Sequence, residues 1–142
     1  MLIADTSGLL ALFTSQDRHH ADIAAYVRRS KAEFAVSPFV VAELDYMVHE
    51  RLGTRASLRM LTSFASPPYQ LAPFGRDDIL AAVAVMTRYP DQAIGLADAS
   101  LGVLAERFRT LDILTLDYRH FDLLRPAQGG PFRLMPRDWD GP

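Results

Sequence analysis

Residues 1–13 read Met-Leu-Ile-Ala-Asp-Thr-Ser-Gly-Leu-Leu-Ala-Leu-Phe, and the rest of the predicted fold is built around this segment. Residues 2–4 form a short apolar run of the β type that ends at Asp5. Ser7-Gly8 then opens a segment in which the apolar residues of 9–13 follow helical spacing. A buried strand that passes directly into a helix is typical of an α/β protein with a parallel sheet.

The same alternation of short strands and longer helices continues along the chain. We predict further strands at residues 34–36, 69–72, 112–116 and, as an edge strand, 132–135. Helices are predicted at residues 18–29, 38–52, 54–64, 77–89 and 94–108, with Ser37, Gly53 and Thr54 as cap residues. We therefore expect an α/β fold, with a central, mostly parallel sheet of four to five strands flanked by helices. One domain would span residues 1–142, with a core of 1–135 and a short tail of 136–142.

The composition excludes several classes of protein. The chain has 142 residues, of which 49% are hydrophobic, and this is enough for one buried core and too apolar for a disordered chain. It contains no cysteine, which excludes disulfides and thiolate metal sites. Neither a signal peptide nor a membrane-spanning run is recognisable, so a cytoplasmic location is expected. The net charge of −2 does not by itself indicate a nucleic-acid partner.

Two acidic side chains are expected at the carboxyl end of the sheet. Asp5 follows the first predicted strand and Asp117 follows the fourth. Ligands of open α/β sheets bind in the crevice outside these strand ends, so both aspartates are candidates for one site. Each could instead be a simple turn residue, because aspartate readily starts and caps turns.

Two more acids lie on predicted helices among apolar neighbours. The residues three and four positions from Glu43 are large and mostly apolar, so we expect its carboxylate to need a metal, a buried hydrogen bond or an arginine. Asp98 has only apolar residues or glycine at the same spacing, and its face should pack against the sheet. The alternative for Asp98 is an aspartate in the first helical turn, stabilised by the helix dipole.

Converging carboxylates repel one another and raise each other's pKa, unless a cation neutralises them. Mg²⁺ and Mn²⁺ prefer oxygen ligands, and Mg²⁺ retains water molecules that can serve as nucleophiles. The four acids therefore indicate metal-assisted hydrolysis of phosphodiester bonds.

Four short motifs, in this order and at these spacings, resemble the PIN-domain ribonucleases, and in particular the VapC toxins of type II toxin–antitoxin pairs. The resemblance extends from residue 1 to about residue 135. The motifs are Ile3-Ala4-Asp5-Thr6-Ser7, Ser37-Pro38-Phe39-Val40-Val41-Ala42-Glu43-Leu44, Ile94-Gly95-Leu96-Ala97-Asp98-Ala99 and Leu114-Thr115-Leu116-Asp117-Tyr118-Arg119-His120-Phe121.

The resemblance implies specific roles and partners. Asp5, Glu43, Asp98 and Asp117 would bind Mg²⁺, with Mn²⁺ as a substitute, and Asp117 fills the most variable acidic position of the family. Thr6 and Ser7 would shape the site, and Thr115 would position Asp117. The chain would be a homodimer, cut structured RNA of the tRNA or rRNA class, and be neutralised by a VapB-type antitoxin.

Basic residues near the last acid are candidates for RNA contacts, since arginine binds phosphate in a bidentate manner. They are Arg107, Arg109, Arg119, His120 and, beyond them, Arg125, and the alternative is a solvated surface.

Other functions fit less well. A haloacid-dehalogenase pattern requires an aspartate where Ser7 stands, and a response-regulator receiver requires a lysine late in the chain, whereas Lys31 is the only lysine. Gly129-Gly130 precedes a strand and lacks the helix of a phosphate-binding loop. The remaining alternative is a catalytically silent PIN fold that only binds RNA or an antitoxin.

Overall fold

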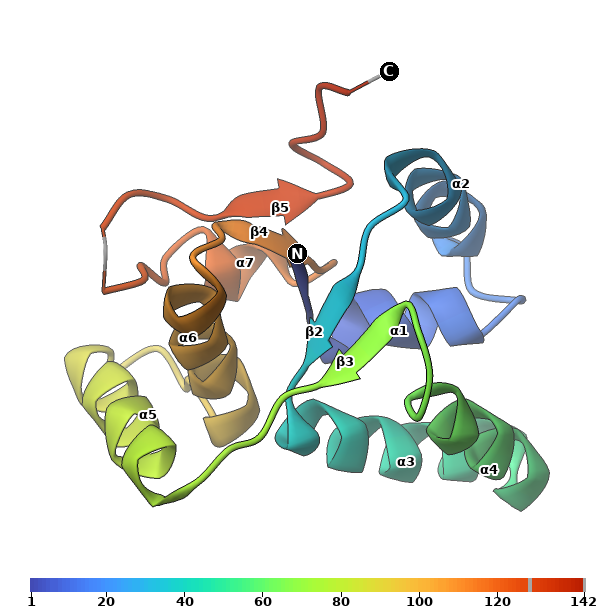
Figure 1. Cartoon of the computed structure of the whole chain (residues 1–142), viewed down its shortest axis with the longest axis horizontal. Coiled ribbons are helices and arrows are strands. Elements are labelled where there is room, and N and C mark those ends of the chain that lie inside the picture. Colours follow the sequence, from blue (N-terminus) through green and yellow to red (C-terminus); the bar gives the residue numbers. More distant parts are fainter. Residues whose placement is uncertain (128, 142) are drawn as a thin grey trace.

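The computed structural model describes residues 1–127 and 129–141, which form a five-stranded parallel sheet with helices around it (Figure 1). The strands are β1 (Leu2–Ala4), β2 (Phe34–Val36), β3 (Tyr69–Leu71), β4 (Asp112–Leu114) and β5 (Arg133–Met135). The helices are α1 (Thr6–Phe13), α2 (His20–Ser30), α3 (Pro38–Leu52), α4 (Thr54–Ser63), α5 (Arg76–Arg88), α6 (Leu96–Phe108) and α7 (Tyr118–Phe121). The predicted fold class is confirmed, and every strand pair is parallel.

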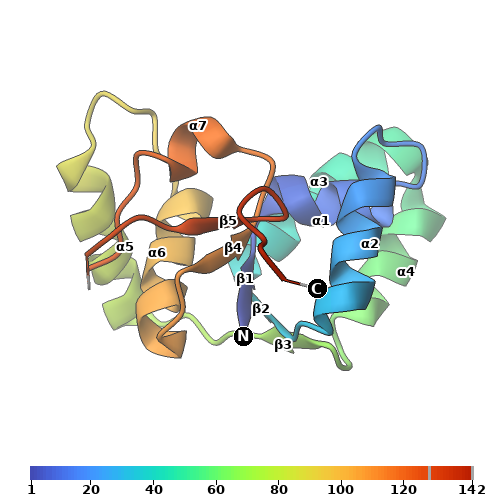
Figure 2. The ribbon, with the colours of Figure 1, turned by 90° about the horizontal axis from the view of Figure 1, so that it is seen from above.

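The strand order is β3-β2-β1-β4-β5, so the chain builds outward from β1 to one edge and then crosses to its other side. Ile3 lies between Ala35 of β2 and Ile113 of β4 in the register. The topological switch point is therefore between β1 and β4, where ligands of such sheets bind. Helices α5 and α6 lie to one side of the sheet, and α1, α2 and α4 to the other (Figure 2).

The central strands are buried on both faces, and Ile3 of β1, Phe34 of β2 and Ile113 of β4 have no exposed surface, nor does Leu134 of the edge strand β5. This explains why three-residue strands suffice, since the helices cover both faces of a parallel sheet. Within the described residues, no helix has both the length and the apolar character needed to cross a membrane.

Several predicted boundaries were wrong by a few residues. The strand expected at 112–116 ends at Leu114, because the Leu116 N–H donates to the Ser7 hydroxyl (2.9 Å) instead of to a neighbouring strand. The helix expected from residue 94 begins at Leu96. Thr54 is not a cap, since it begins α4 and Gly53 occupies the cap position with a φ of 86°. Helix α7 was not predicted.

Residues 136–139 pack back onto the domain. Arg137 forms ion pairs with Asp122 and Asp138, and its guanidinium lies 4.9 Å from the centre of the Tyr118 ring. The Trp139 ring meets the Tyr26 ring of α2 edge-on at 5.2 Å. The segment after β5 therefore packs against both α7 and α2.

Candidate active site

The four predicted acids line one cleft of about 280 Å³ at the carboxyl ends of β1 and β4. We call this hollow the acid cleft. Asp5 follows β1, Glu43 comes from α3, Asp98 from α6, and Asp117 precedes α7. The cleft is lined by Asp5, Thr6, Ser7, Leu10, Asp17, Glu43, Met47, Asp98, Leu116 and Asp117.

Asp5 is the buried centre of the acid cleft, with 5% of its surface exposed. Its Oδ2 accepts hydrogen bonds from the hydroxyls of Ser7 and Thr115, both at 2.7 Å. Burial raises the pKa of Asp5, the two hydroxyls oppose this shift, and the charge of Asp98 adds to it. The fold thus maintains a carboxylate where its charge is costly, as binding and catalytic sites often do.

The hydroxyls of Ser7 and Thr115 also position the chain after β4. The Ser7 Oγ accepts the N–H of Leu116 (2.9 Å), and the Thr115 Oγ1 accepts the N–H of Asp117 (2.9 Å). Each hydroxyl therefore joins the end of β1 to the segment that carries Asp117. Ser7 and Thr115 thus lie between Asp5 and the segment of Asp117.

Glu43 lines the cleft from the surface of α3. Its apolar neighbours in the sequence suggested a buried carboxylate, but the residue is exposed. Its neighbour Tyr46 is exposed too, with 68% of its surface accessible, because this face of α3 is not covered by another element. Partial desolvation in the cleft and the charge of Asp5 still raise the pKa of Glu43. The side chain of Thr6 opposes this shift.

Asp98 lies both at the start of a helix and in the wall of the acid cleft. It lies in the first turn of α6, where its Oδ2 accepts the N–H of Gly95 (3.3 Å). It also lines the acid cleft. Its burial raises its pKa most strongly and the Gly95 N–H lowers it, while the nearby carboxylates of Asp117 and Glu43 raise it further.

Asp117 caps α7 and holds a histidine at the edge of the cleft. Its Oδ1 accepts the N–H of His120 (3.3 Å), and its Oδ2 lies 2.8 Å from Nδ1 of the same residue. The short helix α7 is thereby fixed to the cleft by its own N-terminal acid. His120 therefore lies next to the acids of the cleft.

The candidate arginines are not all near the cleft. Arg107 donates to the Pro73 carbonyl and to Oδ1 of Asp78 (2.6 Å), so its guanidinium joins α6 to the start of α5. Arg107 and Arg109 lie at the opposite end of α6 from Asp98, about 14–16 Å away at a rise of about 1.5 Å per residue. Arg119 is exposed on α7, beside the cleft. Arg125 donates to backbone carbonyls of Asp122 and Leu124.

Asp17 is a fifth acid in the cleft that the sequence analysis missed. It lies in the turn between α1 and α2, and its Oδ1 accepts the N–H of His19 (2.8 Å). The other four acids lie at strand ends or on helix faces, whereas only the return of this turn over α1 brings Asp17 to the acids. The spacing of residues 14–19 carries no signal for that path.

The donor set fits a hydrated hard cation. Over residues 1–127 and 129–141, no three acidic or histidine side chains converge closely enough to hold a metal ion between them. A Mg²⁺ ion does not require such a cage, because it retains several waters and binds through one or two carboxylates. The buried Thr6 Oγ1 lies close enough to Glu43 to lower the pKa of that carboxyl, but it forms no full hydrogen bond with a described residue, so it is open to a water of a hydrated ion or to a substrate oxygen.

Comparison with known proteins agrees with this geometry. The PIN-domain profile matches residues 2–125. The chain is 47% identical to Ribonuclease VapC26 of Mycobacterium tuberculosis over 135 residues, which are 95% of this chain and 100% of that protein. Its fold is similar to that of M. tuberculosis VapC20, a toxin that cleaves the sarcin-ricin loop, with a TM-score of 0.76. The two sequences are 19% identical, and the match covers 82% of this chain and 90% of VapC20.

A toxin–antitoxin complex from Klebsiella pneumoniae contains a similar fold, with a TM-score of 0.65, 19% identity and 85% and 90% of the two chains covered. The two structural comparisons support the fold, and the extended identity to VapC26 supports the family. The chain therefore belongs to the PIN-domain family and, within it, to the VapC ribonucleases.

Proposed function

We propose that this protein is a Mg²⁺-dependent endoribonuclease toxin, with Mn²⁺ as a substitute ion, that hydrolyses phosphodiester bonds of structured RNA of the tRNA or rRNA class. The observation that carries the proposal is the acid cleft, in which Asp5, Glu43, Asp98 and Asp117 meet at the switch point of the sheet. Residues 1–142 would act as one domain, in the cytoplasm.

Each residue of the cleft has a distinct task in this proposal. Asp5 is the fixed ligand, because two hydroxyls hold its Oδ2 and leave Oδ1 for a cation. Glu43, Asp98 and Asp117 bind the ion directly or through its waters, and Thr6, Ser7 and Thr115 shape the site. The bound ion would supply an activated water and neutralise charge on the phosphate.

Contacts to the RNA on either side of the cleft come from basic groups. Arg119 and His120 lie on α7 beside Asp117, and we expect them to contact a phosphate at the cleft. Arg107 and Arg109 lie at the far end of α6, and they would contact only a substrate that extends over that distance.

The activity is tested with purified protein and total RNA in Mg²⁺, in Mn²⁺ and in EDTA. We expect specific cleavage with either metal and none in EDTA. The products should carry 5′-phosphate and 3′-hydroxyl ends, because water rather than the ribose 2′-hydroxyl attacks the phosphate. Specific cleavage that persists in EDTA would overturn the metal mechanism, and RNA that is bound but never cut would favour the catalytically silent binding module.

A VapB-type antitoxin is the proposed partner, together with a second copy of the chain in a homodimer. Several carboxylates in one cleft attract a cationic side chain, and the contact of an arginine with a carboxylate is strong and often bidentate. We expect a disordered antitoxin segment with one basic residue to fold onto the toxin and reach these acids.

A peptide from the C-terminal half of the antitoxin should then inhibit cleavage, and inhibition should weaken when its basic residue becomes alanine. Inhibition that survives deletion of that half would refute this mode of binding.

A further inference from the structure

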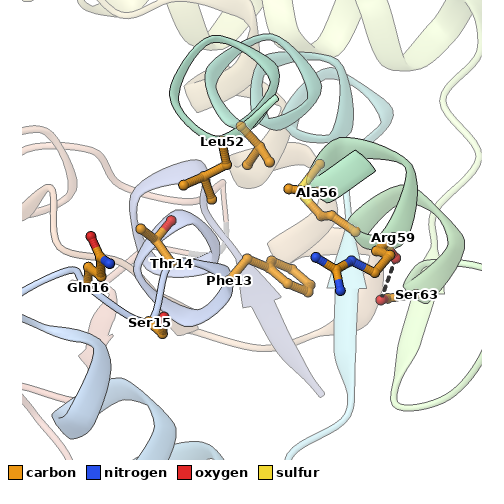
Figure 3. Close-up of a pocket in the computed structure, with 10 residues that line it drawn as sticks. Phe13, Thr14, Ser15, Gln16, Leu52, Ala56, Arg59 and Ser63 are labelled. Atoms are coloured by element: carbon orange, nitrogen blue, oxygen red, sulfur yellow. Dashed lines mark hydrogen bonds between the residues drawn. The ribbon is translucent and has the colours of Figure 1, made fainter. Parts of the chain in front are cut away.

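A second hollow adjoins the acid cleft, between the end of α1 and helices α3 and α4 (Figure 3). It encloses about 480 Å³, within the range of about 300–1,000 Å³ that is typical of ligand sites. Its wall is partly apolar and partly polar, and it includes Phe13, Gln16, Leu52, Ala56, Arg59 and Ser63. We call it the α4 pocket.

The α4 pocket and the acid cleft are next to each other along two elements. Gln16 lines the pocket and the following residue, Asp17, lines the cleft. Met47 of α3 lines the cleft and the following residue, Val48, lines the pocket. The two hollows therefore border each other at two places in the chain, which brings a nucleotide in the α4 pocket close to one in the acid cleft.

The charge of the pocket is opposite to that of the cleft. In the described part of the chain, Arg59 is the one charged side chain of its lining and no acid contributes to it. Helix α4 contains two arginines and no acidic residue, and Arg55 and Arg59 together line a shallow groove on its outer side. A cationic hollow beside an acidic one fits a polyanion that is held by a metal at one position and by arginine at the next.

Arg59 is available for such a contact. It is exposed and forms no ion pair with any residue of 1–127 or 129–141, whereas the guanidiniums of Arg107 and Arg137 are each paired with aspartates. Its side chain extends over the pocket toward Phe13 (Figure 3). An arginine and an aromatic side chain that line one hollow are the combination with which proteins hold the phosphate and the base of a single-stranded nucleotide.

We propose that the α4 pocket binds an unpaired nucleotide of the RNA substrate, next to the bond that is cut. The base would lie on the apolar wall formed by Phe13 and Leu52, and Arg59 would bind its phosphate. This subsite rests on the proposed ribonuclease function, and it would select RNA in which the nucleotide beside the scissile bond is unstacked.

The test compares Arg59→Gln with Arg28→Gln, which removes the same charge from an exposed position on α2 far from the pocket. Binding of a short, fluorescein-labelled, single-stranded RNA of mixed sequence is measured by anisotropy in EDTA, where no cutting is expected. Arg59→Gln should weaken binding about tenfold, or about 1.4 kcal/mol, and lower the slope of log K against log salt by about one. Arg28→Gln should leave binding close to wild type.

A second variant fills the pocket without a change of charge. Ala56→Leu should weaken RNA binding while the melting temperature shows that the fold is retained. With Mg²⁺ present, both pocket variants should raise KM more than they lower kcat, because the subsite holds substrate and does not touch the scissile phosphate.

The outcomes separate this proposal from the one on which it rests. A wild-type protein that neither binds nor cuts RNA overturns both. If the wild type cuts RNA and Arg59→Gln behaves like Arg28→Gln, the subsite is refuted and the ribonuclease function stands. If Arg59→Gln retains RNA binding and loses antitoxin binding, the pocket is a protein-docking surface and the subsite is again refuted.

Discussion

Thr115 and Asp5 are joined by a hydrogen bond of 2.7 Å, donated by a fully buried hydroxyl to the carboxylate at the centre of the acid cleft. The same Oγ1 accepts the N–H of Asp117 over 2.9 Å. One hydroxyl thus links the acid that follows β1 to the acid that follows β4, on the two sides of the switch point. The orientation of both acids depends on it.

Thr115→Val removes this link and keeps the shape of the side chain. Hydrogen bonds to the ionised carboxylate lower the pKa of Asp5, so their loss should raise that pKa further. Cleavage needs the ionised form, and the acid limb of the pH–rate profile in Mg²⁺ should therefore move to higher pH. Thr115→Ser keeps the hydroxyl and should restore the wild-type profile. An unchanged acid limb in Thr115→Val would show that the hydroxyl does not control Asp5.

Asp98→Asn should stabilise the metal-free protein. Burial raises the pKa of Asp98, so the fold loses stability as pH rises from the ordinary pKa of aspartate, about 4, through the raised value of the folded protein. The melting temperature of the variant in EDTA should exceed that of wild type at neutral pH, and the difference should vanish in acid.

Metal should reverse this order of stability. An ion at a hundredfold excess over its Kd stabilises the fold by about 2.7 kcal/mol, and Asp98→Asn should lose most of that gain. Equal Mg²⁺-induced shifts of the melting temperature in the two proteins would remove Asp98 from the metal site.

The close approach of α1 to β4 requires glycine at position 8. A Cβ added to Gly8 would lie 2.7 Å from the backbone oxygen of Leu114, closer than van der Waals contact allows. Gly8→Ala should therefore lower the free energy of unfolding measured in urea by about 1–3 kcal/mol, or by more if α1 is forced off the sheet. Gly102→Ala is the matched control, because a Cβ added to Gly102 of α6 would meet only Val85 of α5, at an ordinary contact distance of 3.9 Å. That variant should be neutral, or more stable by up to about 1 kcal/mol. Similar losses in both variants would contradict this account of α1.

The parallel sheet could be predicted from the sequence, and so could the gathering of the four acids at its carboxyl end. Strand patterns around residues 2–4 and 34–36 are dominated by burial, and burial is directly visible as apolar runs. Asp5 stands out because it follows an apolar strand, and Asp98 because a charge among apolar residues has few explanations. The exposure of Glu43 could not be predicted, since a helical pattern shows which residues share a face and not whether another element covers it. Helix α7 has four residues, too short for a periodic signal.

Arg137 stabilises α7 from beyond β5, through contacts that the sequence did not reveal. Its guanidinium bonds both carboxylate oxygens of Asp122, at 2.8 and 2.9 Å, and it also bonds Asp138, whose Oδ2 accepts the N–H of Leu134. Arg137 thereby holds the pKa of Asp122 and Asp138 below the ordinary range. Such pairs stabilise the fold above the ordinary pKa of aspartate, and the gain is lost as pH falls through the lowered values.

Arg137→Gln should therefore lower the melting temperature at neutral pH and have less effect in acid. Arg137→Lys should restore only part of the loss, because lysine cannot bind a carboxylate in a bidentate manner. Arg88, exposed at the end of α5 and in no ion pair of the described residues, provides the control variant Arg88→Gln. A loss of stability that is independent of pH would show that the ion pairs are not its source.

The dependence of RNA cleavage on Mg²⁺ in Glu43→Gln and Glu50→Gln tests the metal mechanism most directly. Both glutamates are exposed on α3, and of the two only Glu43 lines the acid cleft, so the variants remove the same charge from the same helix. Glu50→Gln should cut RNA at the wild-type rate across the Mg²⁺ titration. Glu43→Gln should be slower by about a hundredfold or more, since it loses a ligand to the ion. Wild-type cleavage by Glu43→Gln at every Mg²⁺ concentration would contradict the proposal that the acids of this cleft bind the metal that cuts RNA.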